Sequence, residues 1–236
     1  MAIMDRTAYS NPAISADESA RAGFIRRTYR HLAGAILAFV VLEAIILQLP
    51  IAGAITSLLT SGYGWLVVMG AYIGVSFLAD RWARSDTSPQ MQYLGLGLFV
   101  VAEAIVFLPL LYIASYYAAA NVIPTAAAIT GFLFLGLTAV VFFTRRDFSW
   151  MRSILTIGGF IAMGFIVASI LFGFSLGLFF SVVMVAYAGG AILYDTSNIL
   201  HHYRTDQHVA ASLALFASVA LLFWYVLRIV MASSDD

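Results

Sequence analysis

Lysine and cysteine are both absent from this chain of 236 residues, and only 10% of its residues are charged. Soluble domains carry about 25% charged residues. Hydrophobic residues make up 62% of the chain, so it has too few polar groups to cover a water-facing surface, and we expect an integral membrane protein. The lack of cysteine excludes disulfides and thiolate metal sites, and it says nothing about the cellular compartment.

The charged residues are arginine, aspartate and glutamate, and the net charge is zero. No basic patch interleaves with aromatic residues, which argues against a nucleic-acid partner. The first 30 residues are polar and contain no apolar core followed by a cleavage site. We therefore expect residues 1–30 to form a polar tail, partly disordered around residues 10–20, rather than a signal peptide.

Seven apolar segments are long enough to cross a membrane, which takes about 20 residues each. No strand alternation is visible, and a helix satisfies its own backbone hydrogen bonds in lipid. The sequence therefore predicts an all-α, polytopic membrane protein: one seven-helix bundle over residues 31–232, followed by a short acidic C-terminus at 233–236. The expected spans are Leu32–Gly53, Tyr63–Ala79, Tyr93–Tyr117, Pro124–Phe143, Ser153–Phe172, Leu176–Tyr194 and Val209–Met231.

Arginines gather on the N-terminal side of the first span and on every second connection, while the intervening connections carry no charge. Positive residues near the ends of spans mark the cytoplasmic side. We therefore expect a cytoplasmic N-terminus. Arg228, in the last turn of the seventh span, is the exception among the twelve; the other eleven are Arg6, Arg21, Arg26, Arg27, Arg30, Arg81, Arg84, Arg145, Arg146, Arg152 and Arg204.

Asp195 is the most informative residue, because it lies in the sixth apolar segment before that segment leaves the hydrocarbon. A lone carboxylate there costs roughly 2.5–3.5 kcal/mol, and intramembrane acids are functional by default. Arg81 closes the second span on the same side and can extend its long side chain toward this acid. We expect an Asp195–Arg81 ion pair at the inner mouth of the bundle, either as a gating latch or as a static link between two helices.

Glu43 and Glu103 lie about 12 and 11 residues into the first and third spans, so their heights match near the bilayer centre. If these helices face each other, the two carboxylates share a proton and become candidate ligands for a hard cation. The alternative is that both are protonated and form hydrogen bonds between helices. His201, His202 and His208 lie together near the inner side, where they are solvated loop residues or pH sensors.

No catalytic motif or constellation is present, so the chain is not expected to be an enzyme, and no cofactor or metal site is expected. An intramembrane aspartyl protease needs two close aspartates, and Asp195 has no second aspartate in another span.

The string AGGAILYDTSNI at 188–199, with Ala211-Ser-Leu-Ala-Leu-Phe in the last span, resembles the signature of the Bax inhibitor-1 (transmembrane Bax-inhibitor-motif) family. The resemblance implies a seven-helix bundle with the last helix enclosed by the others. It also implies a pH-sensitive calcium leak linked to stress responses, and bacterial members include a modulator of a membrane-bound protease. In the family, the acid matched by Asp195 pairs with a second aspartate and an arginine, which Arg81 matches.

The seventh span departs from that pattern, because Ser218 stands where the second aspartate is expected. A serine can donate a hydrogen bond to Asp195 but cannot share its proton or add charge for a cation. The resemblance implies a bacterial inner-membrane leak channel for Ca²⁺ or H⁺, gated by Asp195, Arg81 and Ser218. Glu43 and Glu103 are the candidate ion ligands. The alternative is a non-conducting regulator that binds a membrane protease through the N-terminal tail.

Overall fold

The computed structural model describes residues 12–85 and 88–234. Within these ranges the chain is helical without any named strand, and seven helices are long and apolar enough to cross a membrane. The all-α, seven-span prediction is therefore confirmed. The spans are α2 (Glu18–Leu47), α4 (Gly64–Ala83), α5 (Pro89–Tyr117), α6 (Val122–Thr144), α7 (Met151–Phe172), α8 (Gly177–His201) and α9 (His208–Ser234).

Two elements differ from the sequence prediction. Helix α2 begins at Glu18 rather than near Leu32, so the polar stretch before the first apolar run is already helical. A separate short helix, α3 (Ala52–Thr60), follows α2, where the sequence predicts the end of the first span at Gly53 and then an uncharged connection. The helix includes Arg21 to Arg30 because the charged side chains reach water while the backbone keeps its hydrogen bonds.

The segment before α2 packs onto the bundle. A short 3₁₀ turn, η1 (Ala13–Ser15), precedes α2, and the amide of Ala13 donates to the carbonyl of Tyr203 at 2.8 Å. Ala13 itself is fully buried. The disorder expected at residues 10–20 is therefore wrong from residue 12 onward, whereas residues 10 and 11 lie outside the described part. At the other end Ser234 closes α9, and residues 235–236 also lie outside the described part.

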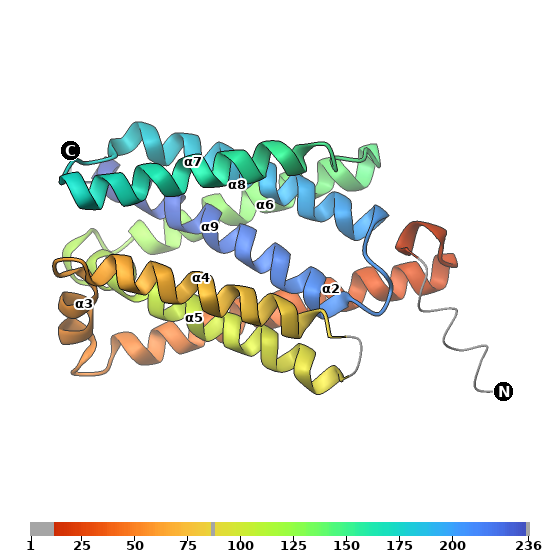
Figure 1. Ribbon diagram of the computed structural model, residues 1–236, viewed down its shortest axis with the longest axis horizontal. Helices are drawn as coiled ribbons and strands as arrows, with labels where there is room; N and C mark the ends of the chain where they lie inside the picture. The colour runs from red at the N-terminus through yellow and green to blue at the C-terminus, as the bar shows by residue number, and fades with distance from the viewer. Residues whose placement is uncertain (1–11, 86–87, 235–236) are drawn as a thin grey trace.

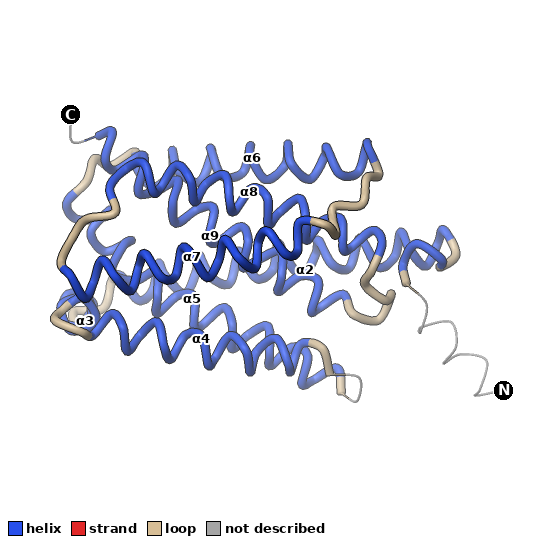
Figure 2. Tube along the Cα trace, turned by 45° about the horizontal axis from the view of Figure 1, so that its top comes forward, coloured by secondary structure: helices blue, strands red, loops and turns tan. Residues whose placement is uncertain are grey.

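Helix α9 runs through the middle of the bundle (Figures 1 and 2). It packs against α2, α4, α5, α6 and α8, and its buried residues lie all around its circumference. A helix that is apolar on every side is one that other helices surround. The structure thus confirms the enclosed last helix. The outermost span is α7, which packs mainly on α8 and exposes large apolar side chains such as Phe160 and Phe165.

The contact between α4 and α5 is unusually close at Gly95. A Cβ atom at this position would lie 2.6 Å from the carbonyl oxygen of Ala79 and 2.7 Å from the amide nitrogen of Ala83. Only glycine lets the two backbones approach in this way. Gly95 therefore fixes the last turn of α4 against α5, and with it the position of Arg84, which directly follows α4.

Candidate functional site

Asp195 and Ser218 join the two helices at the centre of the bundle. The hydroxyl Oγ of Ser218, on α9, donates a hydrogen bond of 2.6 Å to Oδ2 of Asp195 on α8. This is the contact that the alignment with the family pattern predicts. Asp195 lies six residues before the end of α8 at His201, and thus about 9 Å inside that end at 1.5 Å per residue.

The arginine whose charge acts on Asp195 is Arg84, whereas the sequence predicts Arg81 as the partner. Arg81 and Arg84 are both exposed at the end of α4, and the two differ in the direction from which they leave the helix. The sequence could not distinguish the two, because both end the same helix and its rotation is set by packing against α5. Arg84 forms its own ion pair with Asp80, with Nε 2.9 Å from Oδ2, so it reaches Asp195 through its field rather than through a described ion pair.

Tyr203, in the connection between α8 and α9, lies between these charged groups. The Nη2 atom of Arg84 donates to its hydroxyl at 3.5 Å, and the Arg84 guanidinium carbon lies 5.7 Å from the centre of its ring. Burial raises the pKa of Tyr203 to about 12; the Arg84 guanidinium lowers this pKa, and the Asp195 carboxylate raises it. Tyr203 therefore stays neutral at physiological pH and couples the α4 terminus to the Asp195 region.

Glu103 has a partner that the sequence did not reveal. The hydroxyl of Tyr72, on α4, donates to Oε1 of Glu103 at 2.6 Å. Glu103 is 4% exposed and lies on α5, which presents most of its length to the core. The Tyr72–Glu103 hydrogen bond therefore links α4 to α5 near the middle of the span.

Glu43 has a different environment. It is 3% exposed, and neither of its carboxylate oxygens has a hydrogen-bond partner among the described residues. It continues the buried face of α2 that includes Phe39, which contacts Phe107 of α5 and Phe216 of α9 edge-to-face. The structure shows no hydrogen bond between Glu43 and Glu103, and Glu103 instead forms a hydrogen bond to another helix, as in the alternative interpretation.

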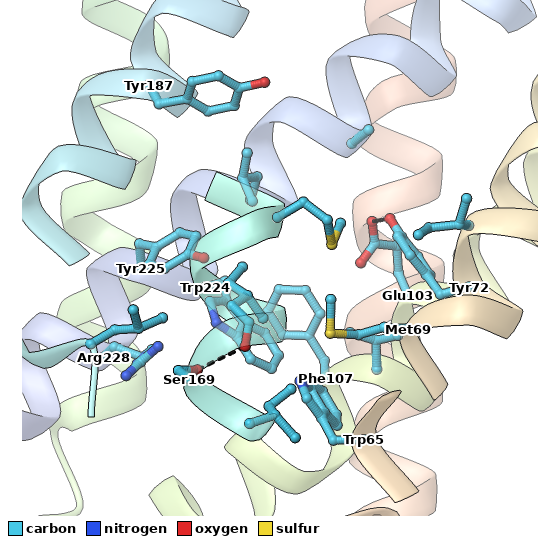
Figure 3. A pocket seen from close by; sticks show the side chains of 18 of the residues that line it. Trp65, Met69, Tyr72, Glu103, Phe107, Ser169, Tyr187, Trp224, Tyr225 and Arg228 are labelled. Atoms are coloured by element: carbon cyan, nitrogen blue, oxygen red, sulfur yellow. Dashed lines mark hydrogen bonds between the residues drawn. The ribbon is translucent and has the colours of Figure 1, made fainter. Parts of the chain in front are cut away.

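A cavity of about 610 Å³ opens between α4, α5, α7, α8 and α9. It begins where α4 starts and α9 ends, near Trp65 and Arg228, and extends inward to Ser218. Figure 3 shows Glu103 beside Tyr72 on one side of the cavity, with Tyr225 and Arg228 on the other. The walls of the cavity are mainly apolar and aromatic. Glu103 is the one acidic residue among the residues described as lining the cavity.

Ser218 belongs to both features, since it lines the cavity and donates to Asp195. Hard cations such as Ca²⁺ prefer oxygen ligands, with six to eight of them in a complete site. Glu103, Ser218 and Asp195 supply a series of oxygen atoms rather than one such cage. In the part of the chain that the structure describes, no three acidic, histidine or cysteine side chains converge on a metal position. The arrangement suits transient contacts with a cation better than tight binding.

The histidines do not form one cluster. His202 contacts Asp147 at 3.7 Å, while His208 packs against His31 with ring centres 4.9 Å apart. The pKa of Asp147 is lowered, chiefly because the amide of Ser149 donates to it. His31 was missed because it lies far from the other histidines in sequence, and only the packing of α2 on α9 brings it to His208.

The chain is similar in sequence to known membrane proteins. The family model described as inhibitor of apoptosis-promoting Bax1 matches residues 21–235. An uncharacterized protein of Pseudomonas aeruginosa is 30% identical, with 72% of this chain and 76% of that protein aligned. Bax inhibitor 1 of Schizosaccharomyces pombe is 26% identical over 99% and 85% of the two chains. The modulator of FtsH protease YccA of Escherichia coli is 29% identical over 78% and 83%. This chain therefore belongs to the Bax inhibitor family of membrane proteins.

Proposed function

We propose that the protein is a leak channel for a cation, Ca²⁺ or H⁺, and that Asp195 is the carboxylate at the narrowest part of the path. The observation that supports this is the double role of Ser218, which lines the cavity and donates to Asp195 at 2.6 Å. A cation that enters the cavity meets Glu103 first and Asp195 next. Beyond Asp195, Tyr203 and Arg84 close the opposite end.

In this proposal Arg84 is the arginine of the gating latch, in place of Arg81, which the sequence predicts. The positive charge of Arg84 near Asp195 repels an approaching cation. The Asp80 ion pair ties Arg84 to the last turn of α4, and the Tyr203 contact ties it to the connection between α8 and α9. Displacement of this turn would remove the repelling charge and open the path.

The protein is proposed to lie in the bacterial inner membrane with its N-terminus in the cytoplasm. Eleven of the twelve arginines, all except Arg228, fall on the proposed cytoplasmic side, which is the distribution that the positive-inside rule requires. A relative in Escherichia coli, 29% identical over 78% of this chain, carries the name inner membrane protein YccA. With this orientation the cavity faces the periplasm, and the Arg84–Tyr203 cluster faces the cytoplasm.

The test is Ca²⁺ flux into liposomes that contain the purified protein and a calcium dye. Asp195→Asn keeps the size of the side chain and a hydrogen-bond acceptor for Ser218, but it removes the charge. We expect the flux to fall about fivefold or more, as for a loss of about 1 kcal/mol of cation stabilisation. Flux equal to that of empty vesicles for the unchanged protein would refute conduction.

The name of one relative supports a second candidate function, the regulation of a membrane protease. The Escherichia coli protein that is 29% identical is named modulator of FtsH protease, so a non-conducting regulator that binds a membrane protease is the alternative. The expected contact through the tail must be tested by deletion of residues 1–11. Deletion through Arg27 would also remove Phe24, which is fully buried, and would perturb the bundle. Loss of protease capture after the short deletion, with D195N unaffected, would favour the regulator.

A further inference from the structure

A second cavity, of about 400 Å³, lies at the end of the bundle where α2 begins and where α6 and α8 end. Four ionisable side chains line it: Glu18 and Arg21 from the first turns of α2, Arg145 after α6, and His201 at the end of α8. These groups come from three segments that are far apart in sequence. They carry two fixed positive charges and one negative charge on a single concave surface.

The two arginines are not paired with Glu18, the one acid that lines the cavity. Neither Arg21 nor Arg145 forms an ion pair with any residue that the structure describes. The Nδ1 atom of His201 donates to the carbonyl of Ser197, 2.9 Å away, which leaves its Nε2 atom for another partner. Two unpaired guanidinium groups beside a single carboxylate leave the cavity with a net positive charge, which suits an external anionic group.

Arg145 has a distinctive backbone conformation. Its φ is +51°, which makes it the one residue other than glycine with a positive φ in the described ranges. Its amide donates to the carbonyl of Val141 at 2.8 Å and so ends α6. A positive φ is uncommon for a residue with a long side chain, and glycine would fit this position with less strain. Arg145 therefore holds its side chain at this helix end in a backbone conformation that is costly for an arginine.

The cavity wall also has an apolar part. Ile25 of α2 and Phe142 of α6 line it, and Ile14 at its rim is 53% exposed. A cavity that has both charged side chains and an apolar wall suits a lipid at the membrane boundary, where the headgroup meets the acyl chains. Basic pockets between transmembrane helices bind phospholipid headgroups in this way. A soluble anion would make no use of the apolar part.

We propose that this cavity binds a phospholipid with an ethanolamine headgroup. Arg21 and Arg145 hold the phosphate, and Glu18 holds the ammonium group, while the acyl chains lie along Ile25 and Phe142. Glu18 determines the headgroup, because its carboxylate repels a purely anionic lipid and attracts one that carries an amine. The proposal is independent of conduction, since none of these residues lines the larger cavity.

The test is lipid retention by the full chain purified in a mild detergent and titrated with phosphatidylethanolamine, phosphatidylglycerol or inorganic phosphate, with bound ligand counted by native mass spectrometry. We expect the unchanged protein to bind phosphatidylethanolamine more tightly than phosphatidylglycerol. Inorganic phosphate should neither bind at comparable concentration nor displace the lipid. Removal of both guanidinium groups in R21A/R145A should weaken binding by about tenfold for each arginine.

The matched control is R26A/R152A, which removes two exposed arginines that do not line the cavity. It should bind as the unchanged protein does, and R21K/R145K, which keeps both charges, should bind better than R21A/R145A. E18Q should abolish the preference for ethanolamine. Equal losses in R21A/R145A and in the control would overturn the proposal, as would an unchanged preference in E18Q or displacement of the lipid by phosphate.

Discussion

Ser218→Asp restores the second carboxylate that the family pattern has, and it gives the sharpest prediction about the centre of the bundle. Ser218 Oγ lies 2.6 Å from Asp195 Oδ2, so an aspartate there places two carboxylates within reach of one shared proton. Two unit charges about 4 Å apart repel by about 4 kcal/mol at an effective dielectric constant of 20. That energy separates the two proton-release steps of the pair by about three pH units.

The expected result is a new pH-dependent step in the liposome flux. The ratio of the flux at pH 8 to the flux at pH 7 should be up to about tenfold larger for S218D than for the unchanged protein, because release of one proton changes the deprotonated fraction by at most tenfold for each pH unit. S218A, which removes the hydrogen bond without adding charge, should not gain the step. The double variant D195N/S218D, with a single carboxylate, should lose it. Parallel pH profiles for S218D and the unchanged protein would refute the reasoning.

Three further substitutions test other parts of the structure. R84A should change Ca²⁺ flux several-fold and R81A should not, because the charge of Arg84 acts on Asp195; equal effects would contradict the assignment. Y72F removes the hydrogen bond to Glu103 and should lower the free energy of unfolding in detergent by about 1–3 kcal/mol, and an unchanged denaturation midpoint would contradict it. G95A should cost about 1–3 kcal/mol by overpacking α4 on α5 and should also alter flux, whereas an unchanged melting temperature would show that the backbones separate freely.

Much of the fold follows from composition and length. Hydrophobic runs of span length predict seven helices, because a chain in lipid must satisfy its backbone within each segment. The short helix α3 was missed because most of it lies in residues 54–62, which are too few to cross a membrane and were therefore predicted as a connection. The start of α2 at Glu18 was missed for the opposite reason: its charges suggested a solvated tail, although charged residues are good helix formers.

Residues of the candidate site that their chemistry alone identifies were predicted from the sequence. Contacts that depend on the rotation of a helix about its axis were missed. Asp195 stands out because a carboxylate in an apolar helix is costly, and its contact with Ser218 follows from alignment with the family pattern. The choice between Arg81 and Arg84 depends on the close approach of α4 to Gly95. The partner of Glu103 on α4, likewise, depends on a register between helices that no local pattern contains.

The most direct test of the central claim compares Ca²⁺ flux through the unchanged protein and through D195N in the same liposome preparation, with incorporation measured for each. The account predicts measurable flux for the unchanged protein and a fall of about fivefold or more for D195N. Equal flux through both proteins would contradict the assignment of Asp195 to the path.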